Sequence, residues 1–292
     1  MNKILIILVF PTIFFAMEQN KQIWDGKHYK NNSSPQFRTA MELLATLNLK
    51  KYTHILDVGS GSGQVTAAIA TAAPHAQVIG IDLSESMVAE AQKSYPDVPN
   101  LTFKQVDAQR TDTFFFPRAS NSIDLAFSSA VFLWIKDKHH AIDNIHTALT
   151  QGGHMMIKTT APRAPNHPLN LALMQLAQTP KWAAFAQAYM SKPQSFPISI
   201  EQAHQLITPE KWNNISITER GITNLFDSSQ EFCEWMQGWM GGMPAVAALE
   251  KDKQVELSTD FVNHYLKLPE TRNADGKIVY ALPGILIEAN KK

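Results

Sequence analysis

The sequence predicts an α/β protein built on a doubly wound, mostly parallel sheet. Apolar strands alternate with amphipathic helices from Ile55 to about residue 160, which is typical of a parallel sheet covered by helices on both faces. The first strand runs into a loop with glycine at three alternate positions, Gly59, Gly61 and Gly63. Glycine is needed where a backbone turns sharply or touches a ligand, so this loop predicts a nucleotide-like ligand at a strand-to-helix turn.

The other elements of the first half follow in order. Residues 35–48 are amphipathic, with Phe37, Met41 and Leu44 near helical spacing, and predict a helix before the first strand. Further helices are expected from Val65 and from Leu83. The expected strands are the apolar runs 55–58, 78–81, 101–106, 122–128 and 149–157.

The second half begins with a proline-rich stretch, residues 161–168. Helices are expected over 169–190, broken at Pro180, and over 199–206, 228–238 and 245–268. Strands are expected over 215–218 and over 278–287, the latter interrupted at Pro283. We interpret residues 161–292 as the end of the sheet plus a helical lid over the pocket, rather than as an independent domain.

Length and composition restrict the function classes. A chain of 292 residues fits one large domain or one domain with an appendage. The 26 basic residues balance 26 acidic ones, so no global field draws the protein to nucleic acid or to anionic membranes. The single cysteine, Cys233, excludes an intramolecular disulfide and a Cys-rich metal site. We therefore expect no metal and no nucleic-acid partner.

The glycine loop differs from a dinucleotide-binding fingerprint. That pattern needs glycine or alanine five residues after the first glycine, where Gln64 stands here. Asp57 also places a carboxylate where a pyrophosphate would be repelled and a cationic amino acid would be attracted. S-adenosylmethionine carries an ammonium, a sulfonium and no phosphate. The loop therefore favours S-adenosylmethionine over NAD.

Acids also follow the second and third strands. Asp82 ends the second strand, about 20 residues beyond the glycines, where a carboxylate accepts hydrogen bonds from ribose hydroxyls. Asp82 could instead cap the next helix, although Ser84 is at least as good a cap. Asp107 follows the third strand and is a candidate to bind the adenine amino group.

Taken as a set, Asp57–Gly63, Asp82 and Asp107 resemble the first three cofactor motifs of the Rossmann-like S-adenosylmethionine-dependent methyltransferases. Residues 122–128 and 149–157 resemble the fourth strand and the opening of the fifth in that family. The resemblance implies a seven-stranded Rossmann-like sheet with an inserted helical lid. It also implies cofactor contacts from Asp57, Gly59, Ser60, Gly61, Gly63, Asp82, Leu83, Met87, Asp107, Ala108 and Ser128.

Two residues suit the binding of a methyl acceptor. A carboxylate acceptor is already ionised at about pH 7 and needs neutral donors rather than a base. Gln36 opens the first expected helix and Trp134 follows the fourth strand, and their amide and indole N–H groups are neutral donors. Each also has a purely structural interpretation, as a first-turn helix residue and as core packing respectively.

A second resemblance bears on the acceptor. Trp24, Asp25, Tyr29, Ser33–Ser34 and Gln36 resemble the N-terminus of small-molecule carboxyl methyltransferases, especially the trans-aconitate and juvenile-hormone-acid groups. This resemblance implies that Gln36 and Trp134 face a substrate carboxylate. The tail, with Glu234–Trp235 and 275–278, resembles the trans-aconitate group more loosely.

The resulting hypothesis is an O-methyltransferase for the carboxylate of a small organic acid. Lid residues Arg163, Trp235, Trp239 and Arg272 are candidates to meet further carboxylates, and Arg163 is favoured among them. Three alternatives stay open. These are methylation of a phenolic, amine or lipid-like small molecule, S-adenosylmethionine binding without catalysis, and, more remotely, an NAD oxidoreductase.

Residues 1–16 resemble a signal peptide, with Lys3, an apolar run and Ala16. The run is short for a transmembrane helix, so we expect no stable membrane insertion of the main domain. Either this segment directs secretion, or it is an extension created by a wrongly chosen start codon upstream of Met17. We favour a cytoplasmic enzyme, because S-adenosylmethionine is made there, with residues 17–292 as the methyltransferase domain, 17–160 being its cofactor-binding half.

Overall fold

The computed structural model describes residues 34–114, 122–191 and 193–292. The predictions for residues 1–16 and for Trp24, Asp25, Tyr29 and Ser33 lie outside the described residues. Seven strands form the central sheet: β1 (His54–Val58), β2 (Gln77–Asp82), β3 (Leu101–Gln105), β4 (Ile123–Ser129), β5 (Leu149–Thr160), β6 (Trp212–Glu219) and β9 (Gly284–Lys291).

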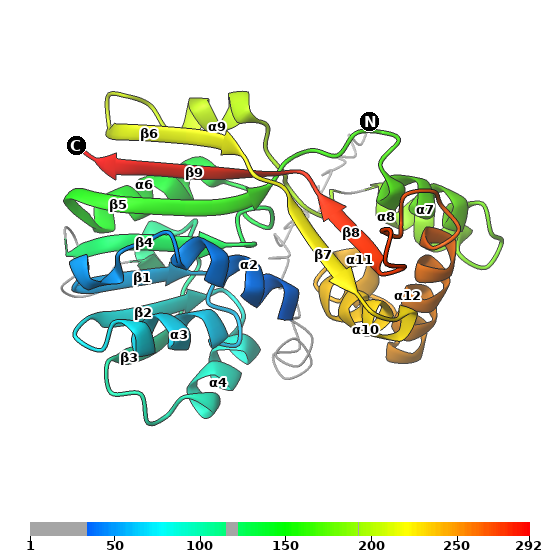
Figure 1. Ribbon diagram of the computed structural model, residues 1–292, viewed down its shortest axis with the longest axis horizontal. Helices are drawn as coiled ribbons and strands as arrows, with labels where there is room; N and C mark the ends of the chain where they lie inside the picture. The colour runs from blue at the N-terminus through cyan, green and yellow to red at the C-terminus, as the bar shows by residue number, and fades with distance from the viewer. Residues whose placement is uncertain (1–33, 115–121, 192) are drawn as a thin grey trace, which may run out of the picture.

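The strand order is β3-β2-β1-β4-β5-β9-β6 (Figure 1). The first five strands are parallel, and β9 is antiparallel to both of its neighbours. The chain therefore reverses direction across the sheet between β1 and β4, the position where doubly wound sheets bind ligands at the carboxyl ends of their strands. The predicted doubly wound, mostly parallel seven-stranded Rossmann-like sheet is confirmed.

Helices cover both faces of this sheet. They are α2 (Ser34–Leu44), α3 (Gln64–Ala72), α4 (Glu85–Ser94), α5 (Thr111–Phe114), α6 (Lys138–Ala148) and α9 (Ile200–Leu206), with the short 3-10 helix η1 (Leu49–Lys51). Ile55 packs with α2 and α3, whereas the next residue, Leu56, packs with α6 and α9. Both side chains are fully buried, as expected for a central strand covered on its two faces.

The remaining elements form a second lobe, which we call the helical lobe. It contains α7 (Pro168–Ala177), α8 (Ala183–Ser191), α10 (Ser229–Met240), α11 (Pro244–Ala247) and α12 (Lys251–Tyr265), with the antiparallel pair β7 (Ile222–Phe226) and β8 (Ile278–Leu282). The lobe has an apolar cluster of its own, which includes Trp182, Phe232 and Phe261. In Figure 1 the chain passes from β6 into β7 and from β8 into β9, so one two-stranded ribbon joins sheet and lobe.

Candidate active site

The loop after β1 is shaped by its glycines. Gly59, Gly61 and Gly63 have φ values of 81°, 53° and 88°, a region that side-chain-bearing residues rarely adopt. A Cβ on Gly59 would collide with the side chain of Val131. A Cβ on Gly63 would lie 2.6 Å from the Phe103 ring, so this glycine permits close packing at the start of α3.

The Asp82 carboxylate holds this loop against the end of β2. Its Oδ2 accepts the Gly61 N–H at 2.9 Å, and its Oδ1 accepts the Ser84 N–H at 2.9 Å. Burial raises the pKa of Asp82 above its usual value. The helix cap is supplied separately, because Ser84 Oγ accepts the Met87 N–H. Asp82 is therefore positioned at the strand tip without serving as the cap of α4.

A cavity of about 110 Å³ lies beyond β2 and β3, and we call it the β2–β3 cavity. Five residues predicted to contact the cofactor beyond the glycine loop line it: Asp82, Leu83, Met87, Asp107 and Ala108. Gln109 lines it as well and was missed by the sequence argument. Its amide joins two loops, since Nε2 donates to Asp107 Oδ1 at 3.3 Å and Oε1 accepts the Asp137 N–H at 2.7 Å.

A second cavity, of about 60 Å³, lies beside the end of β1, and we call it the β1 cavity. Asp57 lines it and is only 3% exposed. Its Oδ2 accepts the Thr66 hydroxyl at 2.6 Å, yet burial and the charge of Asp82 raise the pKa of Asp57 to about 7. A cationic ligand would compensate this buried carboxylate.

Two further groups in the β1 cavity need a partner. The hydroxyl oxygens of Ser60 and Ser129 are buried and form no hydrogen bond within the described chain. Unpaired buried hydroxyls are uncommon in proteins, because each loses its hydrogen bonds to water on burial. The cavity therefore offers polar contacts to a small ligand.

The two cavities meet at a common wall formed by Gly59, Gly61, Ala130 and Val131. Ala130 has a φ of 62°, a left-handed conformation that costs about 1–2 kcal/mol for a residue with a Cβ. Such strained residues cluster at ligand sites. Together the cavities form one trough over the carboxyl ends of the strands, at the point where the strand order reverses between β1 and β4.

The two residues predicted to orient the acceptor line different parts of this trough. Gln36 lines the β1 cavity and Trp134 the β2–β3 cavity. Gln36 is linked to the helical lobe, because its Oε1 accepts the indole N–H of Trp235 at 3.0 Å. Ser128 lines neither cavity: it is fully buried, and its hydroxyl donates to the Val58 carbonyl oxygen at 2.8 Å.

The predicted lid residues separate into two groups. Arg163 and Trp239 line a small apolar cavity inside the helical lobe, where Arg163 Nε donates to Asn170 Oδ1 at 3.1 Å. Trp235 is buried and stacked on Trp239. Arg272 is exposed and donates to the Gly276 carbonyl oxygen, so it belongs to a turn and not to a described cavity.

Comparison with known proteins identifies the chemistry. Residues 56–157, which contain the glycine loop and the acids at all three strand tips, match the family described as methyltransferase domain. The chain is an S-adenosylmethionine-dependent methyltransferase. The residues of the trough fit that cofactor, because a buried carboxylate and two unpaired hydroxyls face the cavity where a zwitterionic, sulfonium-bearing group would bind. The resemblance inferred from the motifs is confirmed.

Relatives match this methyltransferase along nearly its whole length. It is 26% identical to trans-aconitate 2-methyltransferase of Acidovorax ebreus (strain TPSY) over 92% of this chain and 98% of the relative. It is 24% identical to trans-aconitate 2-methyltransferase of Yersinia pestis (strain Pestoides F), with the same coverage.

Solved structures share its fold. The YcgJ protein of Bacillus subtilis has a TM-score of 0.57 and 18% identity, over 87% of this chain and 98% of that one. Phosphoethanolamine N-methyltransferase 2 of Haemonchus contortus has a TM-score of 0.56 and 19% identity, over 91% of this chain and 56% of that one.

The described residues contain no helix long and apolar enough to cross a membrane. They also contain no group of three or more His, Cys, Asp or Glu side chains arranged to hold a metal ion.

Proposed function

We propose that this methyltransferase transfers a methyl group to a carboxylate oxygen of a small organic acid. Relatives named trans-aconitate 2-methyltransferase align with 92% of the chain, which supports an acid as the acceptor. The trough supports the same proposal through the chemistry of its lining.

The observation that carries the proposal is the set of titratable groups in the trough. The described residues contribute only three to the two cavities, the carboxylates of Asp57, Asp82 and Asp107. An amine, phenol or carbon acceptor usually needs a proton removed, whereas a carboxylate is ionised at neutral pH. A described lining of neutral donors and cofactor-binding acids therefore suits a carboxylate acceptor.

The three acids are assigned to the cofactor. In this proposal Asp57, with Ser60 and Ser129, holds the methionine part, Asp82 the ribose and Asp107 the adenine. The bound cofactor supplies the methyl group at its sulfonium. The chain contributes alignment of the acceptor oxygen and exclusion of water, and alignment of this kind is worth about 7–11 kcal/mol.

Gln36 is suited to orient the acceptor. An indole N–H can only donate, so the contact with Trp235 identifies the accepting atom of Gln36 as Oε1. The amide Nε2 then keeps its two N–H groups for a partner in the β1 cavity. Two neutral N–H donors can bind a carboxylate without a further charged side chain beside Asp57.

Assay of methyl transfer to a panel of carboxylic acids, phenols and amines tests the proposal. Methyl esters release methanol in alkali, whereas methylated amines and aryl ethers do not, so labelled methanol identifies the product class. We expect alkali-labile product from at least one acid. Stable products from amines or phenols, with none from any acid, would overturn the proposal.

Substitution of Gln36 by Glu tests the orienting role. A glutamate can still accept the Trp235 N–H, but it replaces the amide donor by an anionic oxygen. Turnover of an acid should fall by roughly 5- to 150-fold, the effect of one unmet hydrogen bond at a buried site. Gln187→Glu makes the same charge change at an exposed position of α8 and should leave turnover unchanged. Equal turnover by the two variants would show that Gln36 does not orient the acceptor.

We also propose that the enzyme works in the cytoplasm, where its cofactor is made. Fractionation of cells that express the full chain tests this, since recovery of active enzyme outside the cytoplasm would contradict it.

A further inference from the structure

A third cavity, of about 200 Å³, lies between α2, the end of β5 and the start of β7. It shares none of its lining residues with the other two cavities. Helix α2 separates them, because Gln36, Phe37 and Ala40 line the β1 cavity, whereas Arg38 and Glu42 line this one. We call it the ribbon cavity, because it adjoins the ribbon that joins sheet and helical lobe.

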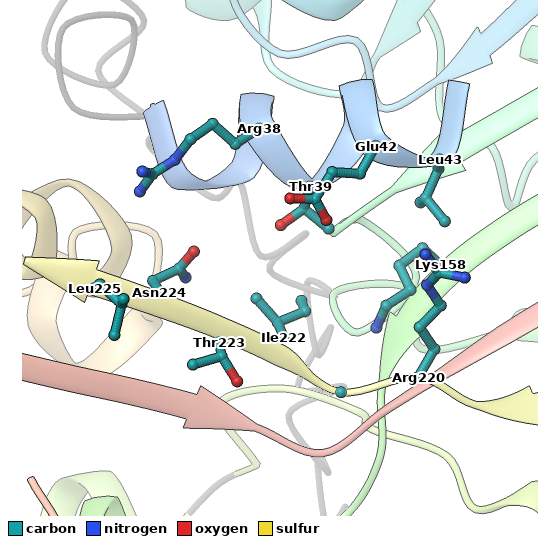
Figure 2. A pocket seen from close by; sticks show the side chains of 11 residues that line it. Arg38, Thr39, Glu42, Leu43, Lys158, Arg220, Ile222, Thr223, Asn224 and Leu225 are labelled. Atoms are coloured by element: carbon teal, nitrogen blue, oxygen red, sulfur yellow. The ribbon is translucent and has the colours of Figure 1, made fainter. Parts of the chain in front are cut away.

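The ribbon cavity is rich in cations. Arg38, Lys158 and Arg220 line it, against a single acid, Glu42. Figure 2 shows Arg38 and Glu42 projecting from α2, with Lys158 and Arg220 at the opposite end from Arg38. None of these four side chains forms an ion pair within the described chain. The described lining therefore carries a net positive charge, with three cationic side chains against the one carboxylate of Glu42.

Lys158 is the unusual member of this group. Its side chain is only 1% exposed, and its Nζ forms one described hydrogen bond, to the Thr159 carbonyl oxygen at 3.2 Å. An ammonium has three N–H donors, so its hydrogen-bonding capacity is incompletely used. Burial and the charge of Arg220 lower the pKa of Lys158 to about 8, which leaves it largely protonated at neutral pH.

The backbone also leaves room for this ammonium. A Cβ at Gly284 would collide with Lys158 Nζ. The Gly284 carbonyl oxygen accepts the backbone N–H of Arg220 at 2.7 Å. This bond places the backbone of Arg220, the second cationic residue, beside the same part of the ribbon. An ammonium that is buried without a partner loses its favourable interactions with water. A lysine buried at this position therefore needs a partner.

We propose that the ribbon cavity binds a small oxyanion, a carboxylate or phosphate group, between Lys158 and Arg220. The ammonium supplies a point charge, and the guanidinium supplies paired N–H donors that match two oxygens of such a group. This site is distinct from the methyl-transfer trough. Because Lys158 lies near the end of β5 and Arg220 lies just before β7, the bound anion links the sheet to the start of the ribbon.

Titration calorimetry with inorganic phosphate and, separately, with succinate tests the site. Both titrations use the whole chain without cofactor or acceptor, at constant ionic strength set with chloride. We expect saturable binding of at least one anion. Competition between the two would assign them to one site, while binding of succinate alone would assign the site to carboxylates. Absence of binding by both overturns the proposal, whatever the enzyme methylates.

Two variants locate the binding. Arg220→Gln removes an exposed charge, and Lys158→Met removes the buried ammonium while keeping an unbranched side chain of nearly the same length. Each substitution should raise the dissociation constant of the anion by about tenfold or more. Lys211→Gln removes a cation that pairs with Asp143 outside the cavity and should change nothing. Unchanged affinity in both cavity variants would overturn the assignment, and Arg220→Gln decides it if Lys158→Met fails to fold.

Discussion

Substitution of Asp57 by Asn tests the electrostatics of the β1 cavity. Asparagine keeps the size of the side chain and an oxygen that can accept the Thr66 hydroxyl, but removes the charge. Raising the pKa of Asp57 from 3.8 to about 7 means that ionising it in the folded chain costs on the order of 4 kcal/mol. The contribution of this group to stability is full below about pH 3.8 and is lost as pH rises to about 7.

Two opposite effects follow from this cost. At pH 8 the ligand-free Asp57→Asn variant should be at least as stable as the parent, because it carries no buried charge at position 57. Its affinity for S-adenosylhomocysteine, whose ammonium is cationic, should nevertheless be about 10- to 100-fold weaker, since hydrogen bonds to charged groups contribute about 1.5–3 kcal/mol. The parent should also bind about tenfold more weakly at pH 6 than above pH 7, whereas the variant should show no such change.

Calorimetric titrations between pH 5.5 and 7.5 measure the affinities and their pH dependence, because the ligand ammonium stays mostly protonated below about pH 7.7. Urea unfolding of the ligand-free proteins at pH 8 measures the effect on stability. Thr66→Val is the matched control. It retains the carboxylate but removes the hydrogen bond that lowers the pKa of Asp57, so its binding midpoint should move to higher pH. Tight, pH-independent binding by Asp57→Asn, equal to that of the parent, would refute the reasoning.

Other substitutions address the loop, the acceptor and the lobe. Gly59→Ala should lower the free energy of unfolding in urea by about 1–3 kcal/mol more than Gly152→Ala, because both positions have positive φ but only the first adds a collision with Val131. Trp134→Phe should reduce kcat/KM for the acid by roughly 2- to 10-fold if the indole N–H contacts the acceptor, and unchanged kinetics would leave it a packing residue. Arg163→Gln should raise KM for di- and tricarboxylates but not for monocarboxylates, and equal effects on both would exclude a role in binding a second carboxylate.

The cofactor side of the trough was accessible from the sequence because its determinants are local. Each of Asp57, Asp82 and Asp107 ends or closely follows an apolar strand, and parallel strands place such residues at one edge of a sheet. The family resemblance also implied a cofactor contact from Ser128, and this contact stays a prediction. The hydroxyl of Ser128 donates to the Val58 carbonyl oxygen of the neighbouring strand, a bond that strand periodicity does not reveal.

The rest depends on contacts between distant segments. Gln36 and Trp235 are 199 residues apart, and no local pattern predicts their hydrogen bond. The strand β7 was also missed, because it places the polar Asn224 on its buried side and so weakens the alternation of apolar and polar residues. The ribbon cavity likewise forms only when α2, β5 and β7 come together, so its cations are unremarkable in the linear sequence.

Titration of the purified chain with S-adenosylmethionine, with NAD in parallel, tests the central claim most directly. A pocket built around the buried carboxylate at the end of β1 should bind the sulfonium compound saturably, at one site per chain, and should not bind the dinucleotide. Failure to bind either S-adenosylmethionine or its demethylated product would contradict the account.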